Sequence, residues 1–436
     1  MTLVSSLLWL VQQLAFVMTV PTFDTFVTVL TGWVFARRRT VTGMILAADA
    51  VGTKHHSAFH RLFAKAQWCL DELGLAVFGL ILPWVREGSV MLALDDTLAR
   101  KRGLKVYGVG MHHDPMISTR KVARVNWAHS GVVLSVIVRF PFCTERYFAL
   151  PILFRLYLNK QTVAKKGGWY RTRPELAVDR RYTLCRAYEN RRFHVVADST
   201  YGGQSVLGDL PENGDLTSRL GLDARLYETP PLPKPGTNGR PRKRGERLPS
   251  PRQRLTGRAR RLMLNIYGRR DKVRLTDCVA RVYAVPQRPL PIVAVEPLTG
   301  GRKIQAFYST PHDASAEQVL TWYAMRWSIE VAFQNSKTHL GFEQPQGWTP
   351  KAVERTAPMA MLLYSLIVLW FARCGHRHYR RPNCPWYNTK RHPSFADMLA
   401  TLRRESVREQ VPSTPLSRRG KQKVLKTLLH AVQHAA

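Results

Sequence analysis

The sequence predicts an α/β protein in which a β-sheet core is flanked by helical regions toward both ends of the chain. Residues 1–85 carry apolar side chains at helical spacing, and from Val90 the pattern changes to short apolar strands. A long helical pattern resumes at Ala314 and continues to about His339, where Gly341 provides a stop signal. With 436 residues, the chain is long enough for more than one core.

The central segments have the order of a ribonuclease-H-like core. Strands are predicted at 90–94, 131–140 and 148–153, a helix at 175–190, and another strand at 193–197. Three strands, a helix and a strand in this order are compatible with a central sheet that carries acidic residues at its strand ends.

A basic segment interrupts this core. The stretch 234–274 holds 15 Lys or Arg residues against 2 Asp or Glu residues, with Pro and Gly scattered through it, so we expect a mobile loop. Strand-like runs at 278–285, 292–295 and 303–308 follow and indicate a β-rich insertion. Further helices are expected at 351–373, 394–408 and 419–434.

The chain is therefore divided into five regions. They are a helical candidate DNA-binding region at 1–85, the first part of the core at 86–204, the basic loop and β-rich insertion at 205–312, a core helix at 313–345, and a C-terminal helical region at 346–436 that is a candidate for dimerisation or DNA contacts.

Composition favours a polyanionic partner and a reducing compartment. The 66 Lys and Arg residues outnumber 30 Asp and Glu residues, giving a formal charge of +36. The longest apolar run, from Ala357 to Ala372, has 16 residues, which is short for a membrane span and predicts a buried helix. Six scattered cysteines form no CxxC pair, and no charged segment precedes the apolar N-terminus, so a cytoplasmic protein is expected.

Two basic clusters are candidates for DNA contacts. They are Arg37, Arg38 and Arg39, which end a helical pattern, and Arg242, Lys243 and Arg244, which lie in the basic segment. The alternative for the first cluster is a solvated helix end without a partner. A zinc site at Cys374, His376, His378 and Cys384 is disfavoured, because the two histidines are only two residues apart among basic neighbours.

Acidic residues follow two buried strands. Asp95 and Asp96 come directly after Leu92-Ala93-Leu94, and Asp198 follows the strand 193–197. Carboxylates at the ends of neighbouring strands converge on one point and provide the oxygen ligands that hard divalent cations require. A single aspartate at a strand end is more often a turn or cap residue.

A third element lies on the predicted helix 314–339. Tyr323, Arg326, Glu330 and Lys337 recur at intervals of 3, 4 and 7, which places them in a stripe about 60° wide. The alternative is an exposed helix face on which Arg326 and Glu330 form an ordinary i,i+4 ion pair.

This pattern resembles the YREK signature of bacterial insertion-sequence DDE transposases, which Tyr323, Arg326, Glu330 and Lys337 match position for position. Asp96-Thr97 and Asp198 are similar to the first and second acidic motifs of that family. The resemblance implies a ribonuclease-H-like catalytic domain with a β-rich insertion, which cleaves transposon ends and transfers the strands into target DNA.

The resemblance also implies site residues and partners. Two Mg²⁺ ions about 4 Å apart, replaceable by Mn²⁺, would be bridged by Asp96 and bound singly by Asp198 and Glu330. Asp95 is the alternative to Asp96, because adjacent strand residues face opposite ways. Arg326 and Lys337 would reach past the metal to DNA phosphates, and Tyr323 would contact phosphate or pack beside the site.

The family further implies double-stranded DNA as partner, both at terminal inverted repeats and at the target, with a homodimer as the active complex at the bacterial nucleoid. Relatives hold a flipped base with an aromatic in the insertion, commonly Trp. This chain has no Trp between Trp169 and Trp322, so Tyr283 and Tyr308 are the candidates. Two rival functions are a ribonuclease-H-like nuclease that does not join strands and a domesticated DNA-binding protein that has lost catalysis.

Overall fold

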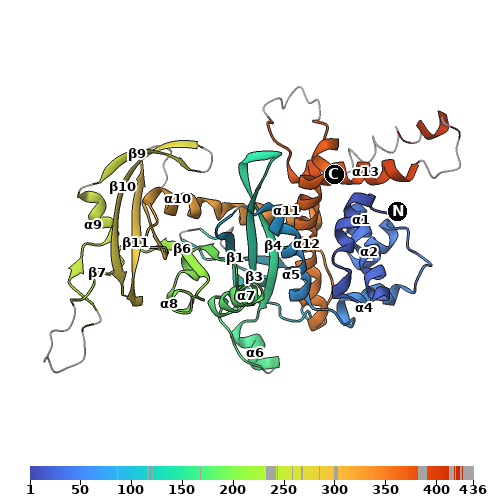
Figure 1. Cartoon of the computed structure of the whole chain (residues 1–436). Coiled ribbons are helices and arrows are strands. Elements are labelled where there is room, and N and C mark those ends of the chain that lie inside the picture. The colour runs from blue at the N-terminus through green and yellow to red at the C-terminus, as the bar shows by residue number, and fades with distance from the viewer. Residues whose placement is uncertain are drawn as a thin grey trace.

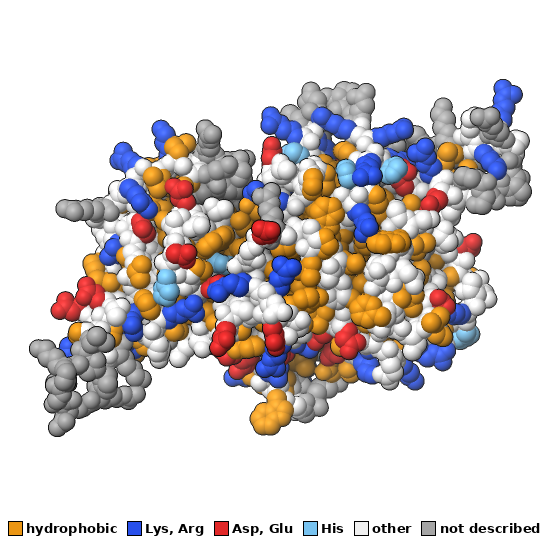
Figure 2. Space-filling view, viewed as in Figure 1, with side chains coloured by type: hydrophobic (Ala, Val, Ile, Leu, Met, Phe, Trp, Pro, Cys, Tyr) orange, Lys and Arg blue, Asp and Glu red, His pale blue; other side chains and the backbone are white. Residues whose placement is uncertain are grey.

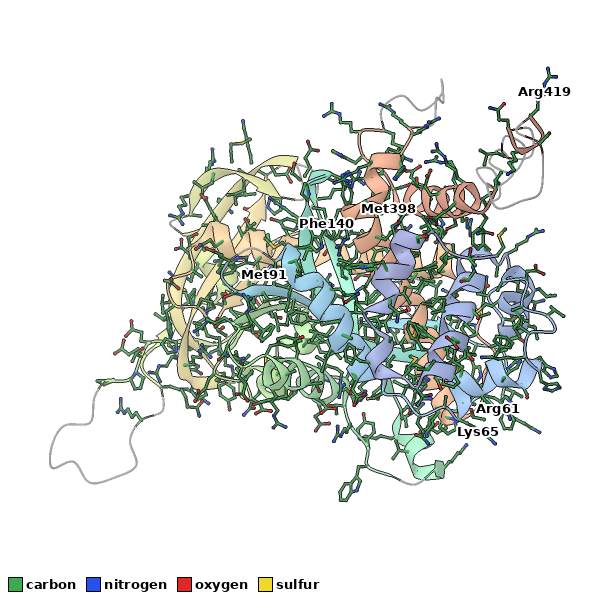
Figure 3. The ribbon with its side chains drawn as sticks, turned by 45° about the vertical axis from the view of Figure 1, so that its right-hand side comes forward. Arg61, Lys65, Met91, Phe140, Met398 and Arg419 are labelled. Atoms are coloured by element: carbon green, nitrogen blue, oxygen red, sulfur yellow. The ribbon has the colours of Figure 1, made fainter. Side chains whose placement is uncertain are left out.

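The computed structural model describes the chain except residues 86, 115–116, 120, 167, 232–241, 243, 258, 267–268, 284, 299–302, 382–389, 412–416, 418, 423–424 and 426–436. Its central sheet lies between a β-rich part and a mainly helical part that contains the N-terminus (Figure 1). Met91, at the start of the central strand, lies between the β-rich part and the helix that carries Arg61, which Lys65 follows (Figure 3). The predicted α/β class is confirmed.

Five strands form the core sheet in the order β4-β3-β1-β5-β6. They are β1 (Val90–Arg100), β3 (Val125–Phe140), β4 (Cys143–Tyr157), β5 (Phe193–Ala197) and β6 (Gly214–Leu220), and the short β2 (Gly110–His113) pairs with the start of β3. β3 is antiparallel to β1 and β4, whereas β5 is parallel to β1 and β6. This is the strand order of a ribonuclease-H-like core, so that prediction is also confirmed.

The two faces of β1 are covered by different helices. The crossover from β4 to β5 contains α6 (Lys160–Lys166) and α7 (Arg173–Ala187), and α7 packs on β3 and β4. Thr97 and Ala99 of β1 share a small apolar cavity with Ala357 and Met361 of helix α12 (Pro350–Arg373) on the other face. Because strand side chains alternate, odd-numbered residues of β1 face α12 and even-numbered ones face α7.

The insertion continues the core sheet. Its elements are β7 (Leu226–Tyr227), β8 (Arg247–Leu248), α9 (Pro251–Thr256), β9 (Arg260–Ile266), β10 (Arg269–Val282), β11 (Val285–Pro297) and β12 (Gln305–Ser309). β12 pairs with β6, which produces one 12-stranded sheet.

The expected mobile loop is wrong for residues 251–256, 260–266 and 269–274, which form α9, β9 and the start of β10. Val273 and Leu275 are buried, while Arg274 between them pairs with Glu296 at 2.6 Å. In this part of β10, Lys272 and Arg274 thus lie on one face, and the buried Val273 and Leu275 lie on the other. Residues 234–241, 243, 258 and 267–268 of the predicted loop lie outside the described part.

Helices from both ends of the chain pack together. The N-terminal ones are α1 (Ser5–Gln12), α2 (Val20–Phe35), α3 (Val41–Ala47), α4 (His56–Ala64) and α5 (Leu70–Ile81), and the C-terminal ones are α12 and α13 (Phe395–Gln410). α12 contacts α1, α4, α5, α13 and β4. Outside the long pattern at 314–339, the remaining described elements are one short helix and four short turns. They are α8 (Gln204–Leu207), η1 (Ala15–Val17), η2 (Leu82–Trp84), η3 (Ser199–Tyr201) and η4 (Gly375–His378).

Helix α12 is the buried helix that the apolar run predicted. Within the described residues, it is the one helix long and apolar enough to cross a membrane, and 89% of its most apolar window is buried inside the protein. Burial of this kind is what the central helix of a protein core shows. The helix expected at 419–434 lies largely outside the described residues.

The long helix predicted at 314–339 is two helices, α10 (Ala316–Met325) and α11 (Trp327–Leu340). The helical assignment stops at Arg326, whose backbone N–H donates to the Tyr323 carbonyl at 3.1 Å. Gly341, with φ of 62°, ends α11 in the left-handed conformation that the stop signal predicted. The residues of the stripe are therefore divided between two helices.

Candidate active site

Three carboxylates share one face of the core sheet. Pairing of the parallel strands β1 and β5 ends with Leu94 opposite Ala197, so the next residues are Asp95, still within β1, and Asp198, directly after β5. Asp198 follows His194 by four positions, and the His194 ring lies 4.4 Å from the Trp322 ring of α10. Since alternate residues share a face, Asp95 and Asp198 point toward α10 and α11, where Glu330 is located.

Asp95 is buried and is joined to α11 by an ion pair. Its carboxylate contacts the Arg326 guanidinium, which also lies 3.4 Å from Glu330. Burial raises the pKa of Asp95 well above its ordinary value, Arg326 opposes this shift, and the charges of Glu330 and Asp198 add to it. The three carboxylates therefore act on one another electrostatically.

Asp96 lies on the opposite face of β1. Its carboxylate accepts a hydrogen bond from the Tyr201 hydroxyl at 2.7 Å and lies 3.4 Å from Nε of Arg173 at the start of α7. Burial raises the pKa of Asp96, while Arg173 and the Tyr201 hydrogen bond oppose the rise. The structure thus brings Asp95, and not the expected Asp96, to Arg326 and Glu330. The reason is that β1 continues to Arg100, so that both aspartates lie inside a strand and face opposite ways.

Asp198 begins the turn that follows β5. Its carboxylate accepts hydrogen bonds from the backbone N–H of Thr200 at 2.9 Å and from the Thr200 hydroxyl at 3.3 Å. Its carbonyl accepts from the Ser218 hydroxyl at 2.7 Å. These bonds fix the turn η3 and the orientation of the carboxylate together.

Glu330 lies in the first turn of α11, where the positive end of the helix dipole favours a carboxylate. Its side chain is 41% exposed, so it borders solvent, whereas Asp95 is enclosed. The site is therefore open on the Glu330 side, which is the side from which a large substrate could approach.

Arg326 does not reach past the acidic residues as expected. Although burial alone would lower the pKa of its guanidinium, Asp95, Tyr323 and Glu330 raise it, so the group stays charged. In the protein without DNA, Arg326 neutralises the carboxylates themselves.

Tyr323 and Lys337 are less accessible than expected. Tyr323 is buried, and its ring lies 4.4 Å from that of Phe307 in β12, so it packs between α10 and the insertion. Of the two expected roles, the structure provides packing beside the site. Lys337 is half-buried, and burial lowers the pKa of its ammonium while Glu343 opposes the shift.

The donor set fits a hard divalent cation, because it consists of carboxylates without thiol or imidazole ligands. Arg326 lies between two of these carboxylates, and within the described part of the chain no three His, Cys, Asp or Glu side chains are gathered closely enough to hold a metal ion. Metal binding at this site therefore requires Arg326 to change partners. In the disfavoured zinc cluster, His376 bonds the Phe371 carbonyl, and Cys384 lies outside the described residues.

The first basic cluster lies beside the end of α11. Arg37 and Arg38 are exposed. The backbone N–H of Arg39 donates to Gln344 Oε1 at 2.7 Å, and the Trp33 indole donates to the Leu340 carbonyl at 2.8 Å. The loop between α2 and α3 is thus fixed next to the helix that carries Glu330.

The second basic cluster and the candidate stacking residues lie in or near the insertion. Arg242 is exposed, the Arg244 guanidinium lies 3.8 Å from the centre of the Tyr283 ring, and Lys243 lies outside the described residues. Tyr283 is 52% exposed, whereas Tyr308 is buried and donates to the Gly202 carbonyl at 2.7 Å. Of the two, Tyr283 is the exposed residue, and the Arg244 guanidinium lies over its ring. Lys and Arg side chains are spread over the whole face seen in Figure 2, so surface charge does not mark a single patch on that face.

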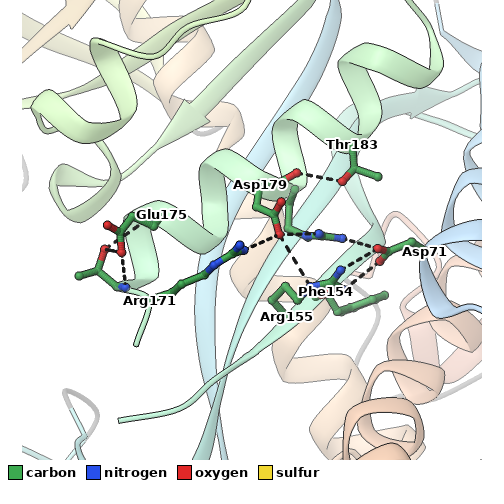
Figure 4. A network of polar contacts seen from close by, with 9 residues as sticks. Asp71, Phe154, Arg155, Arg171, Glu175, Asp179 and Thr183 are labelled. Atoms are coloured by element: carbon green, nitrogen blue, oxygen red, sulfur yellow. Dashed lines mark hydrogen bonds and ion pairs between the residues drawn. The ribbon is translucent and has the colours of Figure 1, made fainter. Parts of the chain in front are cut away.

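Sequence reasoning missed the charged residues around α7. Arg180 is buried between Asp71 at 2.7 Å and Asp179 at 2.8 Å, and Arg155 of β4 joins the same network (Figure 4). These bonds fix α7 against β4 and α5, and α7 begins with Arg173. Tyr201 was also missed, although its position three residues after Asp198 could have indicated that it lies near the site.

Two comparisons with known proteins bear on this site. A model of the family described as DDE superfamily endonuclease matches residues 25–275, a range that contains Asp95, Asp96 and Asp198 and ends before Glu330. A relative from Microchaete diplosiphon, "Probable transposase for insertion sequence element IS701", is 25% identical over 170 residues, which is 38% of this chain and 40% of the relative. The chain thus matches less than half of that relative's length. Because the family match covers more than half of the 436 residues, the chain belongs to the DDE superfamily endonucleases.

Proposed function

We propose that this protein is a DNA transposase that cleaves the ends of a mobile DNA element and joins them to target DNA. The observation that carries the proposal is the placement of Asp95, Asp198 and Glu330 on one face of a ribonuclease-H-like sheet. The printed name of the relative supports a transposase over other endonucleases.

Asp95, Asp198 and Glu330 are the residues that would hold two divalent cations, Mg²⁺ or Mn²⁺. When bound, these ions would activate the attacking oxygen and neutralise charge on the leaving oxygen. We assign to Asp95 the ligand role that the resemblance implied for Asp96, because Asp95 shares its face and the Arg326 guanidinium with Glu330. Asp96 faces α7 and has its own partners there.

Arg326 is the residue that couples the site to DNA in this proposal. Its charge compensates Asp95 and Glu330 in the protein without DNA. A backbone phosphate offers a competing anion with geometry suited to a guanidinium. Lys337 lies seven residues beyond Glu330, about two helical turns along the same face of α11, and would contact the next part of the backbone. Tyr323 packs on Phe307 of the insertion and so supports the junction of α10 and α11.

Double-stranded DNA is the partner that the charge of +36 favours. Arg37 and Arg38 would contact the backbone near the end of α11, and Arg242, Lys243 and Arg244 would contact it from the insertion. We further propose that the substrates are the terminal inverted repeats and a target duplex, that the active complex is a homodimer, and that the enzyme works at the bacterial nucleoid.

The test is a strand-transfer assay with Mg²⁺ and DNA that carries the sequences flanking this reading frame as its ends. We expect nicked ends and joined products with the wild type, and intact DNA with Glu330→Gln. Nicked products without joining would identify a nuclease that does not transfer strands. Binding without cleavage at any metal concentration would identify an inactive DNA-binding protein.

A further inference from the structure

One hydrogen bond joins the two segments that carry the first two carboxylates. The Tyr201 hydroxyl donates to Asp96 Oδ1 at 2.7 Å across 105 residues of sequence. Tyr201 is fully buried and ends the turn η3, which begins directly after Asp198. Asp96 directly follows Asp95, and its backbone N–H donates to Asp95 Oδ1 at 2.9 Å. The buried Tyr201–Asp96 hydrogen bond, on the α7 face of the sheet, therefore links the backbone segment of Asp95 to that of Asp198.

This contact lies just beyond the last residue pair that joins β1 directly to β5. The pairing of β1 with β5 ends at Leu94 and Ala197, so Asp95 and Asp198 are the first residues beyond it. Beyond this pair β1 remains paired with β3, and Ser218 of β6 donates to the Asp198 carbonyl, but neither contact joins the segment of Asp95 to that of Asp198. The Tyr201–Asp96 bond provides that connection.

Both partners of the bond are themselves fixed. The other oxygen of Asp96 lies 3.4 Å from Arg173 Nε and accepts from the Ser130 hydroxyl at 3.5 Å, while Arg173 Nε also donates to Ser130 Oγ at 3.1 Å. A mostly buried carboxylate with a cationic partner and hydrogen-bond donors remains a good acceptor for Tyr201.

The turn is held from its other side by the neighbouring strands. Tyr308 donates to the Gly202 carbonyl, and Ser218 donates to the Asp198 carbonyl, each at 2.7 Å. A Cβ atom at Gly202 would overlap Ser218 Oγ, so this close approach requires glycine. The turn can therefore transmit the position of Tyr201 to Asp198.

We propose that Tyr201 and Asp96 are positioning residues, whose hydrogen bond sets the separation of Asp95 and Asp198 and thereby the affinity of the site for divalent metal. This inference rests on the proposed metal site. It gives Asp96 a role distinct from ligation and assigns a function to a tyrosine that contacts neither metal nor DNA. Hydrogen bonds that orient metal ligands from outside the coordination sphere affect metal affinity in this way.

The test compares Tyr201→Phe with Tyr182→Phe. Tyr182 donates to Asp209 at 2.9 Å at an exposed position, so its variant loses a similar hydroxyl bond away from the site. Mn²⁺ affinity is measured by calorimetry on the full chain without DNA, and the Mn²⁺ concentration for half-maximal cleavage is measured separately. We expect Tyr201→Phe to weaken Mn²⁺ binding by about ten- to a hundredfold, with cleavage largely restored at saturating Mn²⁺. Tyr182→Phe should match the wild type.

Unchanged Mn²⁺ affinity in Tyr201→Phe would overturn the proposal, as would the absence of cleavage at every Mn²⁺ concentration with binding intact. If Tyr201→Phe does not fold, Asp96→Asn and Asp96→Ala decide the matter. Asparagine retains an oxygen that accepts from Tyr201, so it should bind Mn²⁺ more tightly than alanine, and equal affinities would count against the bond. Failure of the proposed metal site is recognised separately, because Asp95→Asn would then bind Mn²⁺ like the wild type.

Discussion

The Asp95 carboxylate forms a buried ion pair with the Arg326 guanidinium, although 231 residues separate them in the chain. The pair connects the central strand β1 to the junction between α10 and α11. Without Arg326, burial and two neighbouring carboxylates would leave Asp95 with no compensating charge. The same guanidinium cannot pair fully with Asp95 and with a DNA phosphate at once, so substrate binding should alter the charge of the site.

Replacing Arg326 by Ala should separate metal binding from DNA positioning. Removal of the competing cation should strengthen Mn²⁺ binding in the protein without DNA, as measured by calorimetry. Removal of the group that holds the phosphate should slow cleavage by about a hundredfold, since a displaced scissile bond is no longer in line. Restoration of cleavage by added Mg²⁺ alone would show that Arg326 does not contact the DNA, and Arg326→Lys serves as the charge-conserving control.

Glu330 should respond to conservative change in a metal-specific way. Glu330→Asp retains the carboxylate but withdraws it by one methylene, so cleavage with Mg²⁺ should fall sharply, because Mg²⁺ demands near-ideal octahedral geometry. Mn²⁺ should restore part of the rate in Glu330→Asp and none in Glu330→Gln. Equal rates for the two variants in both metals would remove Glu330 from the metal site.

Arg37 and Arg38 should contribute to DNA affinity through counterion release. Replacing either by Gln should reduce the slope of log affinity against log salt by about 0.9 for each phosphate that the variant no longer neutralises. Arg186, an exposed arginine on α7, is the matched control, and Arg186→Gln should leave the slope unchanged. Binding to duplex DNA is measured by fluorescence anisotropy across a salt series. Unchanged slopes in both variants would mean that this cluster is a solvated helix end.

His194 should make the fold sensitive to acid. Burial lowers the pKa of its imidazole from 6.5 to about 4, so between these values the unfolded chain takes up a proton that the folded chain excludes. The free energy of unfolding is therefore fully retained above pH 6.5 and falls as the pH drops toward 4, by about 3 kcal/mol from this residue.

Urea unfolding at several pH values checks this expectation. His194→Gln, which can still bond Thr217, should show a smaller loss of stability between pH 6.5 and 4 than the wild type. The remaining dependence should include His129, whose pKa burial also lowers to about 4. An identical pH dependence in the variant and the wild type would contradict the buried neutral state of His194.

Much of the fold could be predicted because its signals are local. Apolar runs marked β5 and parts of β1, β3 and β4, and the run from Ala357 to Ala372 marked α12. The strand β9 and the first part of β10 could not be recognised, because their many basic residues suggested a loop. Their apolar residues, such as Val273 and Leu275, alternate with arginines that the sheet leaves on its other face.

The site could be predicted only in part. The strand end at Ala197 predicted Asp198, and the spacing of the helical stripe predicted Arg326 and Glu330. The choice between Asp95 and Asp96, however, depends on how far β1 extends and on its register with β5. The length of β1 and its register are both determined by pairing with strands distant in the sequence, and residue spacing alone does not reveal that pairing. The ion pair of Arg326 with Asp95 likewise joins residues 231 positions apart, so spacing in the sequence could not predict it.

Cleavage of DNA ends by Asp95→Asn and Asp96→Asn, compared over a range of Mn²⁺ concentrations, tests the central assignment most directly. If Asp95 is the ligand, Asp95→Asn should lose more than about a thousandfold in rate at every concentration, because a charged ligand is missing. Asp96→Asn should recover most of its rate as Mn²⁺ rises. An Asp96→Asn enzyme that stays inactive at all concentrations, beside an active Asp95→Asn enzyme, would contradict the account and place the metal on the α7 face of β1.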